Sequence, residues 1–192
     1  MSGKFDPRSP VDTVTLIAEN PLAWIISTDF QATPLPLIAE TGADGAVKSL
    51  LGHIPLAHPQ YTYLKNNPRA LILFNGPDGY ISPELVSKPD WGPTWNYAVA
   101  RFETEIIFVQ DETDVALERL ANHLETGDWT VDQMGERYGF LVSHIIAFRA
   151  HVRSAHPTFK LGQDEGAETF EEITQSLGDT PLSRGMREQA QR

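Results

Sequence analysis

The chain has no cysteine among its 192 residues. This absence excludes disulfides, iron–sulfur clusters, thiolate-bound zinc and cysteine nucleophiles. Two histidine pairs, His53/His58 and His151/His156, are each five residues apart. That spacing places neither pair on one face of a helix or one side of a strand, so we expect no metal site. Stability must therefore come from packing and assembly.

Positively charged residues are scarce. The sequence has 15 Lys and Arg against 26 Asp and Glu, which gives a formal net charge of −11. Such a field repels a polyanion unless the few cations gather on one face, and no helix-turn-helix pattern is present. Direct nucleic-acid binding is therefore disfavoured. A role in transcription would need an accessory protein.

Long apolar runs are also missing. No stretch approaches the roughly 18 to 20 apolar residues of a membrane-spanning helix. The first seven residues contain no apolar leader region and no small-residue cleavage site. We therefore expect a soluble, cytoplasmic protein with no membrane segment. Hydrophobic residues make up 41% of the chain, and its length fits one domain with a single core.

Short β-prone runs separated by turn residues dominate the sequence after Pro21. They predict strands at 22–28, 33–40, 47–52, 69–75, 95–109 and 145–152. The first three would form an antiparallel meander. Residues 76–79, Gly-Pro-Asp-Gly, predict a tight hairpin turn between the fourth strand and residues 80–83.

Helices are expected at the periphery. A capping pattern beginning at Ser9 predicts a helix to about Glu19. A short helix within 53–66 would cross between strands, and a second capping pattern at Asp111 precedes an amphipathic helix. A further short helix is expected at about 135–141. Six or seven strands with these helices predict a mainly β fold, a small closed or nearly closed antiparallel barrel.

The C-terminal part of the sequence changes in composition. Past Asp164 it is acidic and polar, with one amphipathic stretch at Phe170, Ile173 and Leu177. We expect one barrel domain over residues 1–165, followed by an acidic C-terminal tail or helix over 166–192 that is partly disordered, from about Thr180 onward. Because small barrels fill their interiors with side chains, a cofactor would sit at a rim or a subunit contact.

Several segments carry a resemblance to a known family. They are Gly52-His53-Ile54-Pro55-Leu56-Ala57-His58-Pro59-Gln60-Tyr61, Leu73-Phe74-Asn75-Gly76-Pro77-Asp78-Gly79-Tyr80-Ile81-Ser82-Pro83, Pro93-Thr94-Trp95-Asn96-Tyr97 and Phe159-Lys160-Leu161-Gly162-Gln163. In order and spacing they resemble the FMN-binding negative transcriptional regulator family, also called PaiB-like, within the pyridoxamine-phosphate-oxidase-like split barrels. The resemblance covers roughly residues 20 to 165.

This resemblance implies an antiparallel FMN-binding split β-barrel that forms a homodimer with FMN at each interface. It implies that a turn at Gly52 and His53, with the following helix, lies near the phosphate, and that Trp95, Asn96 and Tyr97 lie near the flavin. Two places depart from the family pattern: His58 stands where the family has Asn, and Gly162 and Asp164 stand where it has Ser and Asn. We expect a weaker or displaced FMN there.

Each candidate residue also has a structural explanation that involves no cofactor. His53 could donate to a phosphate or be a rim histidine with local hydrogen bonds. Trp95 and Tyr97 point to one side of a strand and Asn96 to the other, so the two rings could stack on flavin or fill a core.

Lys160 and Gln163 could reach the phosphate or the pyrimidine edge of the flavin; alternatively, Lys160 is simply solvated. No catalytic residue can be assigned. Three functions stay open: a regulatory flavin-binding protein, an FMN-dependent oxidoreductase similar to flavin reductases, and a barrel that has lost flavin binding.

Overall fold

The computed structural model describes residues 3–190. Its centre is one seven-stranded antiparallel sheet in the order β2-β1-β5-β6-β7-β4-β3, which is not closed into a complete barrel. The strands are β1 (Leu22–Ser27), β2 (Ala32–Pro36), β3 (Ile38–Thr41), β4 (Val47–Pro55), β5 (Arg69–Ile81), β6 (Thr94–Phe108) and β7 (Ile145–Lys160).

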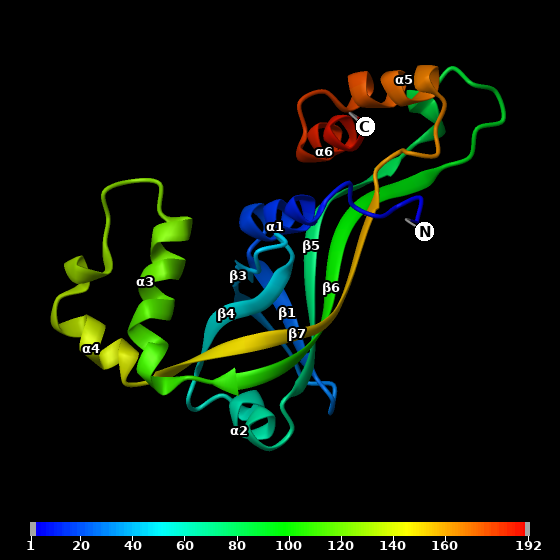
Figure 1. Ribbon diagram of the computed structural model, residues 1–192. Coiled ribbons are helices and arrows are strands. Elements are labelled where there is room, and N and C mark those ends of the chain that lie inside the picture. The colour runs from blue at the N-terminus through cyan, green and yellow to red at the C-terminus, as the bar shows by residue number, and fades with distance from the viewer. Residues whose placement is uncertain (1–2, 191–192) are drawn as a thin grey trace.

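Helices surround the sheet, as Figure 1 shows. They are α1 (Pro10–Glu19), α2 (Pro59–Asn66), α3 (Thr113–Leu124), α4 (Glu136–Val142), α5 (Ala167–Leu177) and α6 (Pro181–Ala190), with short 3-10 turns at η1 (Pro83–Leu85), η2 (Gln110–Glu112) and η3 (Val131–Met134). The expected mainly β fold with peripheral helices is confirmed. Within residues 3–190, no helix is long and apolar enough to cross a membrane.

Helix α1 begins where the sequence predicts. Ser9 is its N-cap and forms a capping box with Asp12, while Pro10 takes the first helical position. Leu16 and Ile17 are buried against the sheet. The helix ends at Glu19, and the backbone N–H of the C-cap residue Asn20 donates to the carbonyl of Leu16.

The single strand expected at 33–40 is wrong, although both antiparallel pairings expected of the meander are present. Two strands form instead, and they lie at opposite edges of the sheet: β2 pairs with β1, and β3 pairs with β4. The break occurs at Leu37, which is fully buried and donates its N–H to the carbonyl of Pro21, 2.9 Å away. Pro34 and Pro36 also lack the N–H groups that a continuous ladder would use.

The hairpin turn expected at 76–79 is also wrong. Strand β5 continues through these residues to Ile81 and stays paired with β6 on both sides. A bulge between Asn75 and Asp78 absorbs the Gly76-Pro77 pair, after which the ladder resumes with Asp78 opposite Tyr97. Bulged strands accommodate glycine and proline, so these residues mark an irregularity rather than a reversal.

Strands β6 and β7 are the longest elements, and the other strands of the sheet lie on either side of this pair. Their ladder runs from Tyr97 opposite Lys160 to Phe108 opposite Phe148. The inward side chains, including Phe74, Phe102 and Phe148, are fully buried in the main core. At one end β7 lies beside α4, and at the other it leads to α5 (Figure 1).

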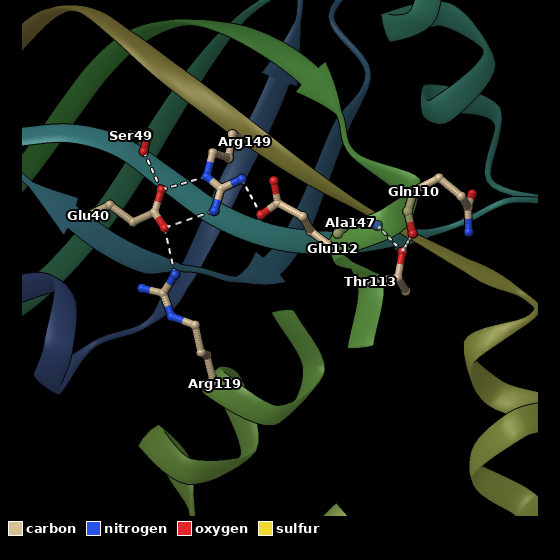
Figure 2. Close-up of polar contacts among 8 residues, drawn as sticks. All are labelled: Glu40, Ser49, Gln110, Glu112, Thr113, Arg119, Ala147 and Arg149. Atoms are coloured by element: carbon tan, nitrogen blue, oxygen red, sulfur yellow. Dashed lines mark hydrogen bonds and ion pairs between the residues drawn. The ribbon is translucent and has the colours of Figure 1, made fainter. Parts of the chain in front are cut away.

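A partly buried ionic network fixes α3 against the sheet. Glu40 on β3 accepts hydrogen bonds from Arg119 Nη1 at 2.6 Å, Arg149 Nε at 2.9 Å and the hydroxyl of Ser49, and Arg149 also pairs with Glu112 (Figure 2). Burial alone would raise the pKa of Glu40, but these hydrogen bonds outweigh it and lower that pKa to about 2. The same carboxylates raise the pKa of Arg149.

The C-terminal segment is folded through Ala190. The amphipathic stretch forms α5, and residues 181–190 form α6, so the disorder expected after Thr180 is wrong for these residues. Leu182 and Met186 are buried in the main core, which supplies the apolar burial that a short helix needs. The division of the chain at residue 165 stays a prediction.

The Glu40 network predicts a defined pH dependence of stability. Because the pKa of Glu40 is lower in the folded state, its ionised form adds stability above about pH 4.5, and that contribution is lost as the pH falls to about 2. We expect Glu40→Gln to lower the free energy of unfolding at pH 7 by about 2 kcal/mol. The deficit should shrink as the pH falls through this window, which urea unfolding at several pH values measures.

Asp44→Asn is the matched control, because Asp44 pairs with Lys48 on the exposed surface. It should change stability far less than Glu40→Gln does, because solvent screens an exposed ion pair. A Glu40→Gln deficit that is the same at neutral and acid pH would contradict the assigned role of this carboxylate.

Candidate functional site

His53 lies within a strand, not in the expected turn after it. The ladder between β4 and β7 continues past Gly52, opposite Phe148, to Pro55, opposite Ile145. Gly52 is buried, and a Cβ there would meet Leu37 Cδ2 at 2.3 Å. The predicted turn at Gly52 was wrong, because this glycine allows close packing between strands and does not reverse the direction of the chain.

The ring of His53 is the unusual polar group of this strand. It is partly buried, its Nδ1 atom is inaccessible, and no described residue hydrogen-bonds to that atom. Burial lowers the pKa of His53, because the charged imidazolium loses solvation. A buried ring nitrogen without a partner is costly, so the His53 ring carries an unsatisfied polar group.

Helix α2 follows directly, and His58 is its N-cap. The Nδ1 atom of His58 accepts a hydrogen bond from the backbone N–H of Gln60 at 3.2 Å. The backbone carbonyl of His58 accepts one from the N–H of Tyr61 at 3.0 Å. The first donors of the helix are thus already used within the chain. His58 therefore acts as a local cap here.

Gln60 is a residue that the sequence reading missed. Its side chain is completely buried, and Nε2 lies within hydrogen-bond distance of the carbonyls of Ile25 and Gln31, at 2.9 Å and 3.0 Å. This ties α2 to the β1–β2 hairpin. The only sequence signal for this role of Gln60 was its place after Pro59 at the start of a helix. Its hydrogen-bond partners lie far away in the sequence, so local sequence does not predict them.

Trp95, Asn96 and Tyr97 occupy the start of β6, and their alternation is as expected. Trp95 is 51% exposed and Tyr97 is partly exposed, whereas Asn96 is buried and its Nδ2 lies 3.6 Å from Met186 Sδ. The two rings therefore do not fill the barrel core. Asn96 faces α6 on the opposite side of the sheet from them.

Trp95 and Tyr80 form an aromatic platform. The Trp95 Nε1 atom donates to Asp78 Oδ1 at 3.0 Å, and the Trp95 ring centre lies 6.0 Å from that of Tyr80. Beside them lies a hollow of about 280 Å³ lined by residues that include Asp78, Trp95 and Tyr97. Asp78, expected to be a turn residue, instead orients the indole.

Lys160 joins the same end of the sheet. It pairs in register with Tyr97, and its Nζ donates to Thr94 Oγ1 at 2.5 Å and to the Trp95 carbonyl at 2.8 Å. Lys160 is therefore neither freely solvated nor far from the aromatic platform. It places a positive charge beside it.

Gln163 serves the local backbone. Its Oε1 accepts from the N–H of Leu161 at 2.7 Å, and its Nε2 donates to the carbonyl of Phe159. Gly162, which precedes Gln163, has a φ of +88°, a conformation in which an L side chain is strained. A Cβ at this position would also meet Met186 Cε at 3.0 Å. Glycine at this departure from the family pattern therefore suits the backbone and the packing of α6.

The candidate residues thus form two separate groups. Gly52 and His53 lie opposite Phe148 and Ala147, whereas Lys160 lies 13 residues further along β7. At 3.3 Å per residue this is roughly 43 Å of strand. The structure does not bring the two groups together within one chain.

Each group fits a different part of FMN. The phosphate needs hydrogen-bond donors in a site with little water, and the partly exposed ring of His53 can offer an N–H group. The isoalloxazine needs an aromatic or apolar surface with polar edges, which the Trp95 hollow provides beside the Lys160 cation. The described residues therefore fit the group that the sequence resemblance implies.

Solved structures share this fold. The flavocytochrome Anf3 from Azotobacter vinelandii has a TM-score of 0.60 at 13% identity, over 81% of this chain and 77% of that one. The FAD and heme binding protein from Mycobacterium smegmatis has a TM-score of 0.57 at 17% identity, over 91% and 80%. At these identities the likeness shows the fold alone.

Sequence comparison gives the family. The chain is 22% identical over 169 residues to the "Protease synthase and sporulation protein PAI 2" of Bacillus subtilis (strain 168), covering 84% of this chain and 80% of that protein. A family model described as "Putative FMN-binding domain" matches residues 2–154. This chain therefore belongs to that family, and FMN is its cofactor.

Proposed function

We propose that this protein is a homodimeric flavoprotein in which each FMN lies between two copies. The observation that supports this is the separation of the two groups along β7, which is far longer than one FMN molecule. Gly52 and His53 of one copy would receive the phosphate. Trp95, Asn96, Tyr97, Lys160 and Gln163 of the other copy would form or support the surface for the isoalloxazine.

An apolar patch on the outer face of the sheet supports a second copy as the partner. Trp24 on β1 is 43% exposed and lies opposite Leu73 on β5, and Leu22 is also exposed. These side chains point away from the core, since their neighbours Ala23 and Ile25 are buried. A strand face of this composition is typical of a subunit contact.

The roles of the residues follow from their positions. His53 would hold a phosphate oxygen, and the bound anion would raise the pKa that burial lowers. Lys160 holds the backbone of Trp95 in place and adds a positive charge at the edge of the platform. Bound FMN supplies electron-transfer chemistry, and these residues bind and orient it.

The phosphate role of His53 is tested by His53→Phe, which keeps a buried ring and removes both nitrogens. We expect FMN affinity to fall tenfold or more, about 1.4 kcal/mol, because a charge-assisted hydrogen bond is lost. Affinity for riboflavin, which has no phosphate, should change little. Fluorescence titration of both ligands measures this, with His123→Phe on α3 as control; equal losses for both ligands would remove His53 from the phosphate site.

The role of Lys160 is tested by Lys160→Ala. We expect FMN affinity to fall tenfold or more, about 1.4 kcal/mol, because the platform loses its cation and the tether on Trp95. Lys48→Ala, an exposed lysine paired with Asp44, is the matched control. An unchanged FMN titration for Lys160→Ala would exclude this residue from the site.

The same two variants test the shared site directly. When His53→Phe and Lys160→Ala chains are co-expressed with different tags, a mixed dimer holds one site with both native residues and one with neither. The purified mixed dimer should bind one FMN per two chains with native affinity. If it binds as weakly as either variant alone, each site lies within one chain.

We further propose a regulatory role exercised through a protein partner, in the cytoplasm. The related Bacillus subtilis protein is named for sporulation and protease synthesis, and the net charge of −11 opposes direct contact with DNA. We expect no sequence-specific mobility shift on DNA at low salt. A specific shift would contradict this, and rapid reduction of the bound flavin by a reduced nicotinamide would favour the oxidoreductase alternative instead.

A further inference from the structure

Residues 113–144 form an arm that stands out from the sheet (Figure 1). We call it the α3–α4 arm. Its base is packed on the sheet, because Ala116 and Leu120 of α3 are buried. Beyond that base, residues 125–130 are all exposed, and neither η3 nor α4 has a buried residue. The outer part of the arm is therefore free to contact another molecule.

Helix α4 has little of the burial that stabilises a short helix. It has seven residues, and one of them is Gly139. A helix of this length is not stable alone in water, and the packing of an apolar face normally supplies the missing free energy. Here Leu141 and Val142 are half-buried, and Tyr138 Oη donates to Asp114 Oδ1 of α3 at 2.7 Å. A further apolar contact would complete the packing of α4.

Large apolar side chains project from the arm into solvent. Phe140 on α4 is 63% exposed, and its ring centre lies 4.3 Å from that of His144. Trp129, in the loop before η3, is 39% exposed. Val115 and Leu124 of α3 are also exposed. Exposed aromatic and aliphatic side chains on an element that stands apart from the core are typical of a contact with another protein.

The arm is also strongly acidic. Its exposed carboxylates are those of Asp114, Glu118, Glu125, Asp128, Asp132 and Glu136. Among the described residues, no lysine or arginine pairs with any of them. Of the two arginines in the arm, Arg119 pairs with Glu40 outside it, and Arg137 is exposed. The arm therefore presents negative charge that the described chain does not neutralise.

Three of these carboxylates lie close together around Tyr138. Burial, a hydrogen bond and three nearby negative charges raise the pKa of Tyr138 to about 12. The charges belong to Asp114, Glu118 and Asp132. Electrostatic effects weaken with distance, so α3 and η3 bring these charges to one place on the arm. A cation bound there would meet carboxylates from two elements beside an aromatic ring.

We propose that the α3–α4 arm binds a segment of a partner protein that is rich in lysine or arginine and also carries apolar side chains. The cations would pair with the carboxylates of α3 and η3, and the apolar side chains would cover Phe140 and Trp129. Charge argues against other occupants of this surface. A second copy carries the same net charge of −11, and an anionic membrane surface would also be repelled.

This inference rests on the proposed role through a protein partner, and it adds the surface and the chemistry of that partner. It requires neither the flavin site nor the homodimer. Peptide binding, flavin titration and the DNA mobility shift are separate measurements, so a failure of this inference is distinguishable from a failure of the proposed function.

The test uses the full-length protein loaded with FMN, and the probe is a fluorescein-labelled amphipathic peptide of leucine and lysine. Two peptides of the same length are controls: one of leucine and glutamate, with the opposite charge, and one of glycine and lysine, without apolar side chains. Fluorescence anisotropy should show the leucine–lysine peptide binding at least tenfold more tightly than either control. Equal binding of a control peptide, or no binding of the probe, would overturn the proposal.

Two exposed aromatic positions locate the probe on the arm. Trp129→Ser/Phe140→Ser should reduce its affinity at least tenfold, whereas Phe30→Ser, at an 88% exposed position between β1 and β2, should leave it unchanged. Retained FMN binding reports that each variant is folded. If light scattering shows that the double variant is a monomer where the native protein is a dimer, these side chains belong to the contact between two copies, and the proposal is overturned.

The contribution of charge is tested separately. The variant Glu118→Gln/Asp132→Asn/Glu136→Gln should reduce probe affinity at least tenfold. A matched control removes three exposed acids near α5 and should weaken binding far less: Glu84→Gln/Asp164→Asn/Glu168→Gln. An equal loss in both triple variants would overturn the proposal, because the probe would then respond to net charge alone. Unchanged affinity in the first triple variant would also overturn it.

Discussion

The antiparallel pairing of β6 with β7 is the constraint on which the rest of the molecule depends. The ladder joins Tyr97 to Lys160 at one end and Phe108 to Phe148 at the other. Because an extended strand has a fixed rise per residue, this pairing sets the distance between the His53 region and the Trp95 platform. If one FMN contacts both groups, it must be shared between two chains, and this condition is the basis of the proposed dimer.

Different interactions secure the two ends of this ladder. At the β4 end, Glu40 forms partly buried ion pairs with Arg119 of α3 and Arg149 of β7, and these pairs hold α3 against the sheet. At the other end, the packing is apolar: Leu182 and Met186 of α6 are buried in the core beside the sheet. The ionic end responds to acid, whereas the apolar end does not. Both ends place candidate residues on strands, which position side chains more rigidly than loops do.

The departures from the family pattern acquire a structural meaning here. His58 caps α2 with its own ring nitrogen, and Gly162 adopts a positive φ beneath Met186. Both serve the backbone at the positions they occupy. Loss of a side-chain hydroxyl at residue 162 is thus coupled to the way α6 packs, and α6 in turn forms one wall of a cavity against α1.

The sequence by itself determined the features that depend on neighbouring residues: the capping box at Ser9, the amphipathic α3, the long strand β6 and the alternation of Trp95, Asn96 and Tyr97. Its motifs in order also identified the flavoprotein family and the cofactor. Only the tertiary structure decided that β2 and β3 separate at Leu37, that β5 runs through Gly76 and Pro77, that His53 lies inside a strand, and that α6 folds. Each of these depends on a partner far away in the chain, such as Pro21 for Leu37, β6 for the bulge, β7 for His53 and the core for Met186. Local propensity is nearly balanced at such positions, so the free energy of remote packing and hydrogen bonding determines the outcome.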